Sequence, residues 1–152
     1  RCTDQSTTHK PTLQGGVVYF RRMEGEVRWT QAEGYVGTTS GGKIFEMYGL
    51  STPGPMEMVL HSHACCSLID VIDGLKDRIN KVKSAIVEVD ADRADQAPRV
   101  FTSIRMKYTI VGDVPEELVR RLIEKSHERY CSVGMMITRS GASLDWSMEV
   151  RQ

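Results

Sequence analysis

Two neighbouring cysteines, a distant third and a nearby histidine could do chemistry together in this 152-residue chain. Cys65 and Cys66 lie in an apolar stretch that predicts a helix, and Cys131 lies near the end of a second helical stretch. If these helices pack together, Cys66 and Cys131 could meet as an attacking and a resolving thiol. A redox thiol must be partly thiolate, so it needs a positive neighbour, a helix N-terminus or a polar partner. His63 shares a face with Cys66, because three residues along a helix turn about 300°. Buried cysteines that act only as small hydrophobic residues are the alternative.

A metal centre is a second interpretation of the same stretch, which holds four good zinc ligands: His61, His63, Cys65 and Cys66. These positions point around the helix, so no single ion can take all four, and His127 or Cys131 would have to help. The chain has no CxxC or HExxH pattern, and we expect no bound metal. It also has no GxGxxG, P-loop or GxSxG motif, so we expect no nucleotide cofactor and no serine hydrolase chemistry.

Composition limits the partners that this chain could have. It carries 20 Lys+Arg and 20 Asp+Glu, so the formal net charge is zero and neither nucleic acid nor an anionic membrane is an expected partner. No apolar run approaches the ~18 residues of a membrane span. Four cysteines are too few for a secreted disulfide framework and fit a cytoplasmic protein with free or redox thiols.

The first third of the chain is typical of an antiparallel meander. Residues 1–14 are polar and lack periodicity, which predicts a flexible N-terminal arm, and we expect residues 15–152 to form a single domain. Short strand-like runs separated by glycines follow the arm. These runs cover residues 17–22, 26–30, 34–39 and 43–48.

Two helices and three further strands complete the expected fold. The first helix should run from Pro55 to about Val82, and its early half is apolar nearly all round, which implies burial on more than one side. A second helix should end near Cys131. Period-2 alternation predicts strands over residues 85–90, 100–110 and 144–150. We therefore expect an α+β protein, with antiparallel sheets packed around two core helices.

Three segments together resemble the OsmC/Ohr family of osmotically inducible and organic hydroperoxide resistance proteins, and the broad OsmC-like subgroup in particular. They read PMEMVLHSHACCSLIDV, PRVFTSIRMKY and EKSHERYCSV. The resemblance implies an intertwined homodimer with sites at the subunit interface. It implies that Cys66, eleven residues after Pro55, is the peroxidatic thiol and that Cys131 is the resolving thiol. His63 matches a histidine of the OsmC branch. The implied substrate is an organic hydroperoxide, and the implied reductant is a dithiol.

The sequence departs from the peroxidase branches at the residues that activate the thiol. Those branches place a Glu directly after the helix-opening proline and pair it with an Arg. Here that position is Met56, and Glu57, a supporting candidate, follows one residue later, turned about 100° away. No Arg occurs between Gln31 and Lys76, so a completing Arg would have to come from earlier in the chain. The candidates are Arg21, Arg22 and Arg28.

These observations lead to three hypotheses. The leading one is a cytoplasmic thiol-dependent peroxidase for organic hydroperoxides in oxidative-stress defence, in which Cys66 is oxidised to a sulfenic acid and Cys131 condenses with it. The alternative is an OsmC-like binding module for a small apolar ligand or a metal, with little or no turnover. In the third, Cys65, Cys66 and Cys131 are all structural. The sequence assigns no role to Cys65 or Cys2.

Overall fold

The computed structural model describes residues 12–14, 17–19 and 22–152, and it divides the chain into two compact units. Unit 1 comprises Arg1–Pro55 and unit 2 comprises Met56–Gln152. Most of the expected N-terminal arm, residues 1–11, lies outside the described residues. Its last three residues form strand β1 (Thr12–Gln14), and the expectation of one domain over 15–152 stays a prediction.

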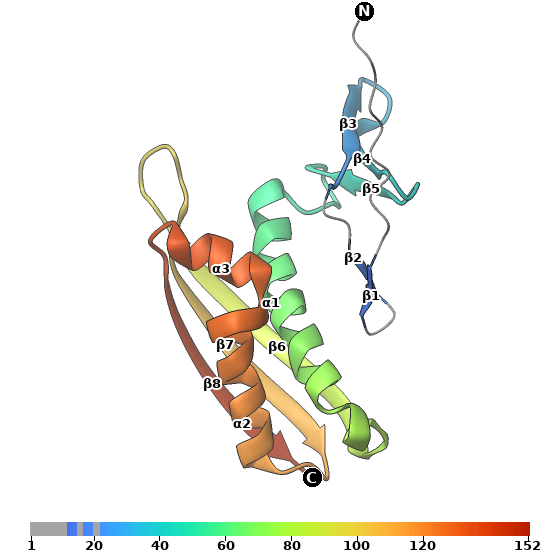
Figure 1. Ribbon diagram of the computed structural model, residues 1–152. Helices are drawn as coiled ribbons and strands as arrows, with labels where there is room; N and C mark the ends of the chain where they lie inside the picture. The colour runs from blue at the N-terminus through green and yellow to red at the C-terminus, as the bar shows by residue number, and fades with distance from the viewer. Residues whose placement is uncertain (1–11, 15–16, 20–21) are drawn as a thin grey trace, which may run out of the picture. The chain divides into compact units, whose positions relative to one another are not determined.

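Unit 1 contains two small antiparallel sheets (Figure 1). β1 pairs with β2 (Val17–Tyr19), and the meander consists of β3 (Gly25–Thr30), β4 (Gly34–Thr39) and β5 (Ile44–Met47). The predicted strands over residues 26–30, 34–39 and 43–48 form an antiparallel meander as expected. The described part of the first predicted strand, β2, instead pairs with β1 in a separate sheet. Gly34 opens β4 with a φ of +70°, a conformation that favours glycine and lets the chain turn tightly after β3.

The first helix is shorter than the sequence predicts. α1 covers Pro55–Gly74, a 3₁₀ helix follows over Lys76–Lys81, and strand β6 begins at Val82. A side chain at Gly74 would collide with Leu122 of the second helix, so the absent side chain lets the two segments approach closely. The three- and four-residue spacing of apolar residues continues through the 3₁₀ turns, which is why the sequence pattern alone placed the helix end too late.

Within the chain, α1 buries one face only. His63, Ala64, Ser67 and Val71 form this buried face, whereas Cys65 is exposed. The expectation of burial on several sides is therefore not met within a single chain. Two of the four buried positions are polar, so this face must satisfy hydrogen bonds as well as pack.

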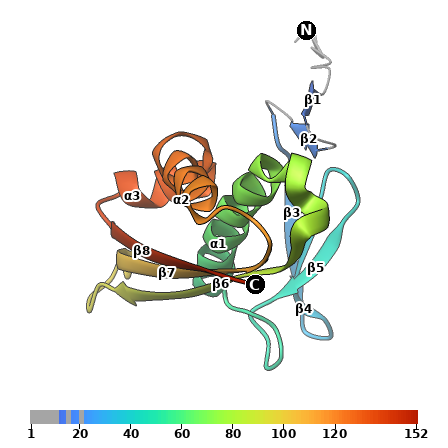
Figure 2. The same cartoon turned by 90° about the horizontal axis from the view of Figure 1, so that it is seen from below.

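Unit 2 is a three-stranded sheet covered by helices on one face, as Figure 2 shows. β6 and β7 pair antiparallel, whereas β8 pairs parallel with β7, so the sheet is mixed rather than purely antiparallel. The α+β class is confirmed, and the parallel pair follows from the helical connection between β7 and β8, since parallel strands need a crossover. The elements are β6 (Val82–Arg93), β7 (Phe101–Gly112), α2 (Glu116–Lys125), a π-helical turn (Ser126–Tyr130), α3 (Ser132–Arg139) and β8 (Ser143–Arg151).

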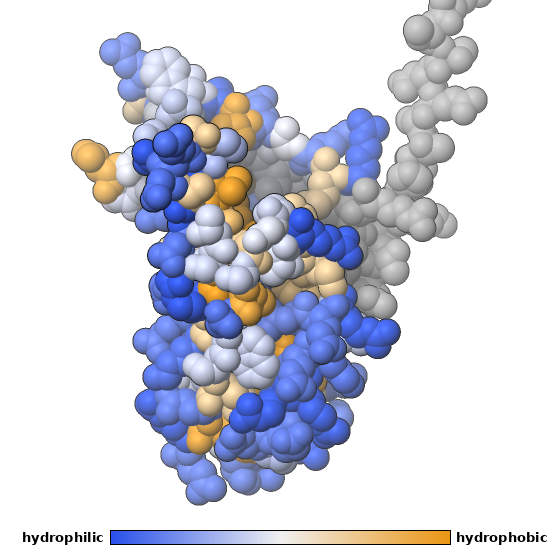
Figure 3. All heavy atoms as spheres, turned by 90° about the vertical axis from the view of Figure 1, so that its left-hand side faces the viewer, coloured by the Kyte–Doolittle hydropathy of each residue, from blue (hydrophilic) through white to orange (hydrophobic). Residues whose placement is uncertain are grey.

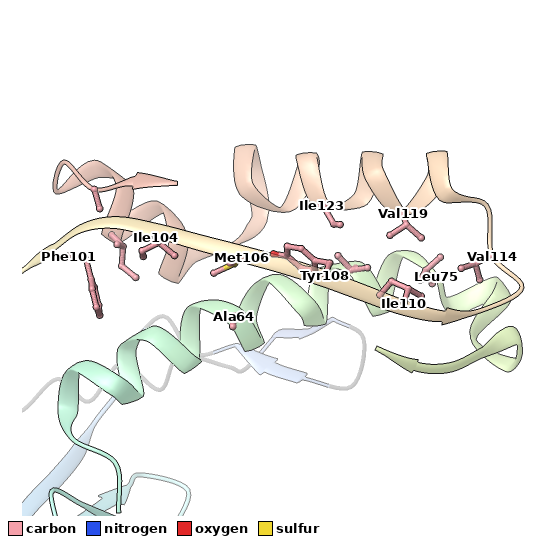
Figure 4. Packing of buried hydrophobic residues seen from close by; sticks show 13 residues of the cluster. Ala64, Leu75, Phe101, Ile104, Met106, Tyr108, Ile110, Val114, Val119 and Ile123 are labelled. Carbon is pink, nitrogen blue, oxygen red and sulfur yellow. Dashed lines mark hydrogen bonds between the residues drawn. The ribbon is translucent and has the colours of Figure 1, made fainter. Parts of the chain in front are cut away.

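Alternation along β7 supplies the centre of the core (Figure 4). Ile104, Met106 and Tyr108 are buried, while Arg105 and Lys107 between them are exposed. A bulge shifts this alternation near the start of the strand, because Ser103 pairs with Asp92 but Phe101 pairs with Arg93. Phe101 is consequently buried where simple alternation would bury its neighbour. From the helices, Val71, Leu75, Val119 and Ile123 join this core.

The outward face of the same sheet is charged. Arg105 forms ion pairs with Asp90 and with Asp92, the latter at 2.8 Å, and Lys107 lies 3.5 Å from Glu149. Figure 3 faces the β8 edge of the sheet, where hydrophilic residues cover most of the surface around a strip of apolar side chains. Among the described residues, no helix is long and apolar enough to cross a membrane.

Candidate functional site

The first half of the candidate site lies on α1. His63 is completely buried, Cys66 is partly buried and Cys65 is exposed. The predicted pairing of His63 with Cys66 along one side of the helix therefore coincides with the buried side of α1. Cys65 and His61 point to solvent instead, which separates them from the buried pair.

Cys131 lies at the junction between the π-helical turn and α3. It is completely buried and serves as the N-cap of α3, where its Sγ accepts a hydrogen bond of 3.3 Å from the Gly134 N–H. The Cys131 Sγ also lies 3.9 Å from the His63 carbonyl oxygen. Sequence analysis placed Cys131 at the end of a helix, and the structure shows that it also begins the next one.

The structure brings the two predicted thiols together in their reduced forms. Burial raises the pKa of the Cys131 thiol to about 12, the Gly134 N–H opposes this rise, and a side-chain hydrogen bond with Cys66 adds to it. Both cysteines are free thiols. Cys131 is therefore a protonated thiol at neutral pH, in contact with a partner that solvent can reach.

His63 lies directly beside Cys131. The Nε2 atom of His63 and the Cys131 Sγ both approach the position that a Cβ of Gly134 would occupy, at 2.5 and 3.2 Å. Neither ring nitrogen of His63 has a hydrogen-bond partner within the part of the chain that the structure describes. Burial lowers the pKa of His63, so the imidazole is neutral and able to accept a proton.

A buried hydrogen-bond chain that the sequence did not predict extends away from this site. Ser126 Oγ lies 2.8 Å from Asp70 Oδ2 and 3.0 Å from Ser67 Oγ. Ser67 Oγ lies 2.6 Å from Tyr108 Oη, which lies 3.0 Å from His127 Nε2. We call these five residues the Asp70–His127 chain. Its members come from α1, β7 and the π-helical turn, so no local motif announces it.

Aromatic packing places the end of this chain against His63. The rings of His63 and His127 are nearly perpendicular, with centroids 5.9 Å apart, and Trp146 lies 6.3 Å from His127 and 6.5 Å from Tyr108. Burial, followed by the neighbouring His63, lowers the pKa of His127 to about 4. Burial raises the pKa of Tyr108 to about 12. Both side chains are therefore neutral at pH 7.

The sequence signal that could have revealed this chain is the presence of polar residues at positions whose spacing predicts that they face the core. Ser67 follows His63 by four residues, so both lie on the same side of α1, and Tyr108 lies on the inward side of β7. A serine and a tyrosine hydroxyl on inward faces must find partners. Sequence analysis placed Tyr108 only within an expected strand, residues 100–110, and considered His127 only as an auxiliary metal ligand.

Of the remaining candidates, Glu57 belongs to the same helix as the buried pair, and the two described arginines belong to the other unit. Glu57 is exposed on the first turn of α1, and its carbonyl oxygen accepts a 2.8 Å hydrogen bond from His61 Nδ1. Arg22 and Arg28 lie in unit 1, where Arg22 pairs with Glu24 and Arg28 pairs with a second glutamate, Glu33. Arg21 lies outside the described residues.

Metal binding receives no geometric support from the described residues, in which no group of three or more His, Cys, Asp or Glu side chains could hold an ion. An apolar hollow of about 450 Å³ lies within unit 1. Val27, Tyr35, Met47, Tyr48 and Pro55 line it. This hollow bears on the binding-module hypothesis, because it would suit a small apolar group.

Comparisons with known proteins place the chain in a family. A family model described as OsmC-like protein matches residues 49–147, and the chain belongs to this family. The resemblance to OsmC/Ohr proteins is thus confirmed. Protein YhfA of Escherichia coli strain K12 is 34% identical over 122 residues, which cover 78% of this chain and 91% of that protein.

Solved structures share the fold. A hypothetical protein from Aquifex aeolicus VF5 is 28% identical with a TM-score of 0.74, and the match covers 88% of this chain and 100% of that chain. An organic hydroperoxide resistance protein OsmC from Legionella pneumophila has a TM-score of 0.59 at 12% identity, with 88% and 99% covered. At that identity the second likeness shows the fold alone.

Proposed function

We propose that this protein is a thiol-dependent peroxidase that reduces organic hydroperoxides in oxidative-stress defence. The observation that carries this proposal is the contact between Cys66, which solvent can reach, and the buried Cys131. Membership of a family that includes organic hydroperoxide resistance proteins supports the substrate class. Two thiols in contact, one accessible and one protected, suit an attacking and a resolving pair.

The reaction has three steps. The Cys66 thiolate attacks one oxygen of the hydroperoxide, the O–O bond breaks, and Cys66 becomes a sulfenic acid while an alcohol leaves. Cys131 then attacks the Cys66 sulfur, forming a disulfide and releasing water. A dithiol reductant reopens the disulfide by exchange, which fits a location in the reducing cytoplasm. His63 and Glu57 remain supporting candidates for polarising the thiol or the leaving oxygen.

Consumption of cumene hydroperoxide with dithiothreitol as reductant tests the proposal. We expect turnover in the wild-type protein and none in Cys66→Ser. The matched control is Cys65→Ser, which changes the adjacent exposed thiol and should keep wild-type turnover. Equal loss in both variants, or turnover that survives Cys66→Ser, would contradict the assignment of Cys66.

The resemblance also implies a homodimer, and exposed apolar residues support it. Unit 1 exposes large apolar side chains, among them Trp29, Ile44, Tyr48 and Leu50. Exposed apolar residues in such number are typical of a surface that a partner covers. We propose that a second copy covers them, and sedimentation equilibrium should give twice the 17.1 kDa chain mass. A monomer at micromolar concentration would contradict this.

A binding module remains the second candidate function, and the apolar hollow of unit 1 favours it. In that case a small apolar ligand would occupy the hollow and the protein would turn over little or no peroxide. Quenching of intrinsic fluorescence by a long-chain alcohol should then persist in Cys66→Ser, because Cys66 lies in the other unit. Binding without any peroxide consumption would favour this candidate over the peroxidase.

A further inference from the structure

All hydrogen bonds of the Asp70–His127 chain are donated in one direction, toward the Asp70 carboxylate. A carboxylate can only accept hydrogen bonds, so the single proton of Ser126 must point to Asp70. One hydroxyl proton cannot also serve the 3.0 Å contact between Ser126 and Ser67, so at that contact the Ser67 hydroxyl donates to the Ser126 oxygen. The 2.6 Å contact between Ser67 and Tyr108 then takes its proton from Tyr108. Each hydroxyl therefore donates toward the carboxylate, and no proton remains free along the chain.

This direction fixes the tautomer of His127. The Ser67 oxygen at 2.6 Å is a closer and stronger acceptor for the Tyr108 proton than Met106 Sδ at 3.3 Å, so the Tyr108 oxygen accepts from His127 Nε2, 3.0 Å away. His127 therefore carries its proton on Nε2 and has a lone pair on Nδ1. That Nδ1 is buried and has no hydrogen-bond partner within the described ranges. A buried lone pair without a donor costs free energy, so its presence calls for an explanation, and a role in the reaction is one.

His63 lies between this imidazole and the buried thiol. Its ring contacts that of His127, and its Nε2 and the Cys131 Sγ both border the space beside Gly134. The titratable groups around it are Cys66 on α1, together with His127 and Cys131 from the segment after α2. Tyr108 of β7 lies behind His127, and Asp70 closes the far end of the chain.

Cys131 needs a base because it is buried as a protonated thiol. A thiol attacks sulfur only as its thiolate, so its proton must leave during the attack. Water has poor access to a fully buried sulfur, whereas the neutral His63 ring is adjacent. A neutral imidazole with two unpartnered nitrogens can take this proton on one nitrogen and donate from the other.

We propose that His63 is the general base that deprotonates Cys131 during disulfide formation, and that the Asp70–His127 chain positions His127 to accept the second N–H of His63. The inference rests on the proposed function. In this step the Cys131–S to Cys66–S bond forms, and the S–O bond of the sulfenic acid breaks with its electron pair leaving on oxygen. The proton passes from Cys131 to His63 and then to the departing oxygen, which leaves as water.

Oxidation without a reductant separates the two halves of the reaction. The protein is treated with one equivalent of cumene hydroperoxide, the Cys66 sulfenic acid is trapped with dimedone, and the Cys66–Cys131 disulfide is followed by mass spectrometry. In His63→Gln we expect the Cys66 sulfenic acid to form and accumulate, because its conversion to the disulfide is slowed by about 100-fold at pH 7. His61→Gln is the matched control on the exposed side of the same helix and should behave as wild type.

The pH profile distinguishes a base from a structural role. The wild-type rate of disulfide formation should be nearly independent of pH from about 7.5 to 8.5, because the lowered pKa of His63 leaves its imidazole neutral there. In His63→Gln the rate should instead rise about tenfold per pH unit over this range, because Cys131 must ionise unaided. A wild-type rate that rises in the same way would overturn the inference, and this measurement needs no variant.

Tyr108→Phe tests the positioning role. It removes only the hydroxyl that fixes the His127 tautomer, so we expect about a tenfold slower disulfide step with sulfenic acid formation unchanged. Wild-type disulfide rates in both His63→Gln and Tyr108→Phe would overturn the inference and leave the peroxidase intact. Loss of sulfenic acid formation in His63→Gln would indicate that His63 deprotonates Cys66 rather than Cys131, and this result would also overturn the inference. Absence of any Cys66 sulfenic acid in the wild type would instead overturn the proposed function.

Discussion

The two faces of strand β7 use polar side chains in opposite ways. On the inward face, Tyr108 is completely buried and lies within hydrogen-bonding distance of Ser67 and His127. On the outward face, Arg105 and Lys107 form ion pairs with neighbouring strands while remaining about half exposed, at 44% and 51% of the side chain. Neighbouring residues on the same strand therefore lie in different environments, one in the protein interior and the other in water.

This difference decides what each group contributes. A buried polar group that loses its partner has no water to replace it and costs about 1–3 kcal/mol. An exposed charge that loses its partner is rehydrated and screened by salt. The inward polar groups are fewer, yet removal of any one of them should cost more than removal of an outward charge. The inward side is also where the thiols lie.

Removal of the Tyr108 hydroxyl should have the largest effect on stability. Tyr108→Phe leaves the Nε2–H of His127 buried without a partner and removes one of the two partners of the Ser67 hydroxyl, so we expect a loss of about 2–3 kcal/mol in the free energy of unfolding. Urea denaturation followed by circular dichroism measures it. Tyr130→Phe is the control, since Tyr130 is exposed, and it should unfold like wild type. Similar urea midpoints for the two variants would show that the Asp70–His127 chain does not contribute to stability.

Substitution of Gly134 tests how tightly the side chains pack beside the Cys131 thiol. A Cβ at this position would stand 2.5 Å from His63 Nε2 and 3.2 Å from Cys131 Sγ, so one of these side chains would have to move. We expect Gly134→Ala to lower the free energy of unfolding by about 2 kcal/mol and to slow disulfide formation. Ser132→Ala is the control, because Ser132 is exposed at the start of α3 and its substitution changes no buried contact. Gly141→Ala is less suitable, because Gly141 has a φ of +107°. Unchanged stability would indicate that His63 can leave its position freely.

Acidification should lower the free energy of unfolding through the buried histidines of the inward side before it affects the ion pairs of the outward face. The folded pKa of His127 is about 4, against an ordinary value of 6.5, so between these limits the unfolded state binds more protons and stability falls as the pH falls. Since His127 is partly exposed, we expect a loss of about 1–2 kcal/mol from pH 7 to about pH 5. His63, whose pKa is also lowered, acts in the same direction. The raised pKa of Asp70 acts in the opposite direction, at lower pH.

Urea midpoints measured across this range check the prediction. The slope of stability against pH should decrease in His127→Gln, because the group that takes up the proton is gone. Stability that rises on acidification over the same range would contradict the neutral, buried state of both histidines.

Local patterns predicted the elements of this fold well. Period-2 alternation located β7 and β8, and glycine spacing located the meander of unit 1, because both signals are carried by neighbouring residues. Errors arose where a distant contact or an irregularity intervenes. The end of α1 depends on Leu122 packing against Gly74, and the burial of Phe101 depends on a bulge opposite Arg93.

The candidate site divides in the same way. His63 and Cys66 could be paired from their helical spacing, and Cys131 was found as a thiol near the end of a second helix. The Asp70–His127 chain could not be found, because Ser67 and Ser126 are separated by 59 positions and only tertiary packing brings them together. Resemblance identified the cysteines, whereas the groups that control their protons became visible only in three dimensions.

The smallest expected effect belongs to the outward face. Arg105→Gln removes the ion pairs with Asp90 and Asp92 but keeps a long polar side chain on an exposed strand. Water and salt can replace both partners, so the urea midpoint should stay within error of wild type, and about 1 M sodium chloride should not widen the difference. If Arg105→Gln destabilises the protein as much as Tyr108→Phe does, then exposure does not control the strength of these contacts. The outward ion pairs would then have to be treated as a cooperative network, coupled through Asp92 and Ser103, rather than as independent surface charges.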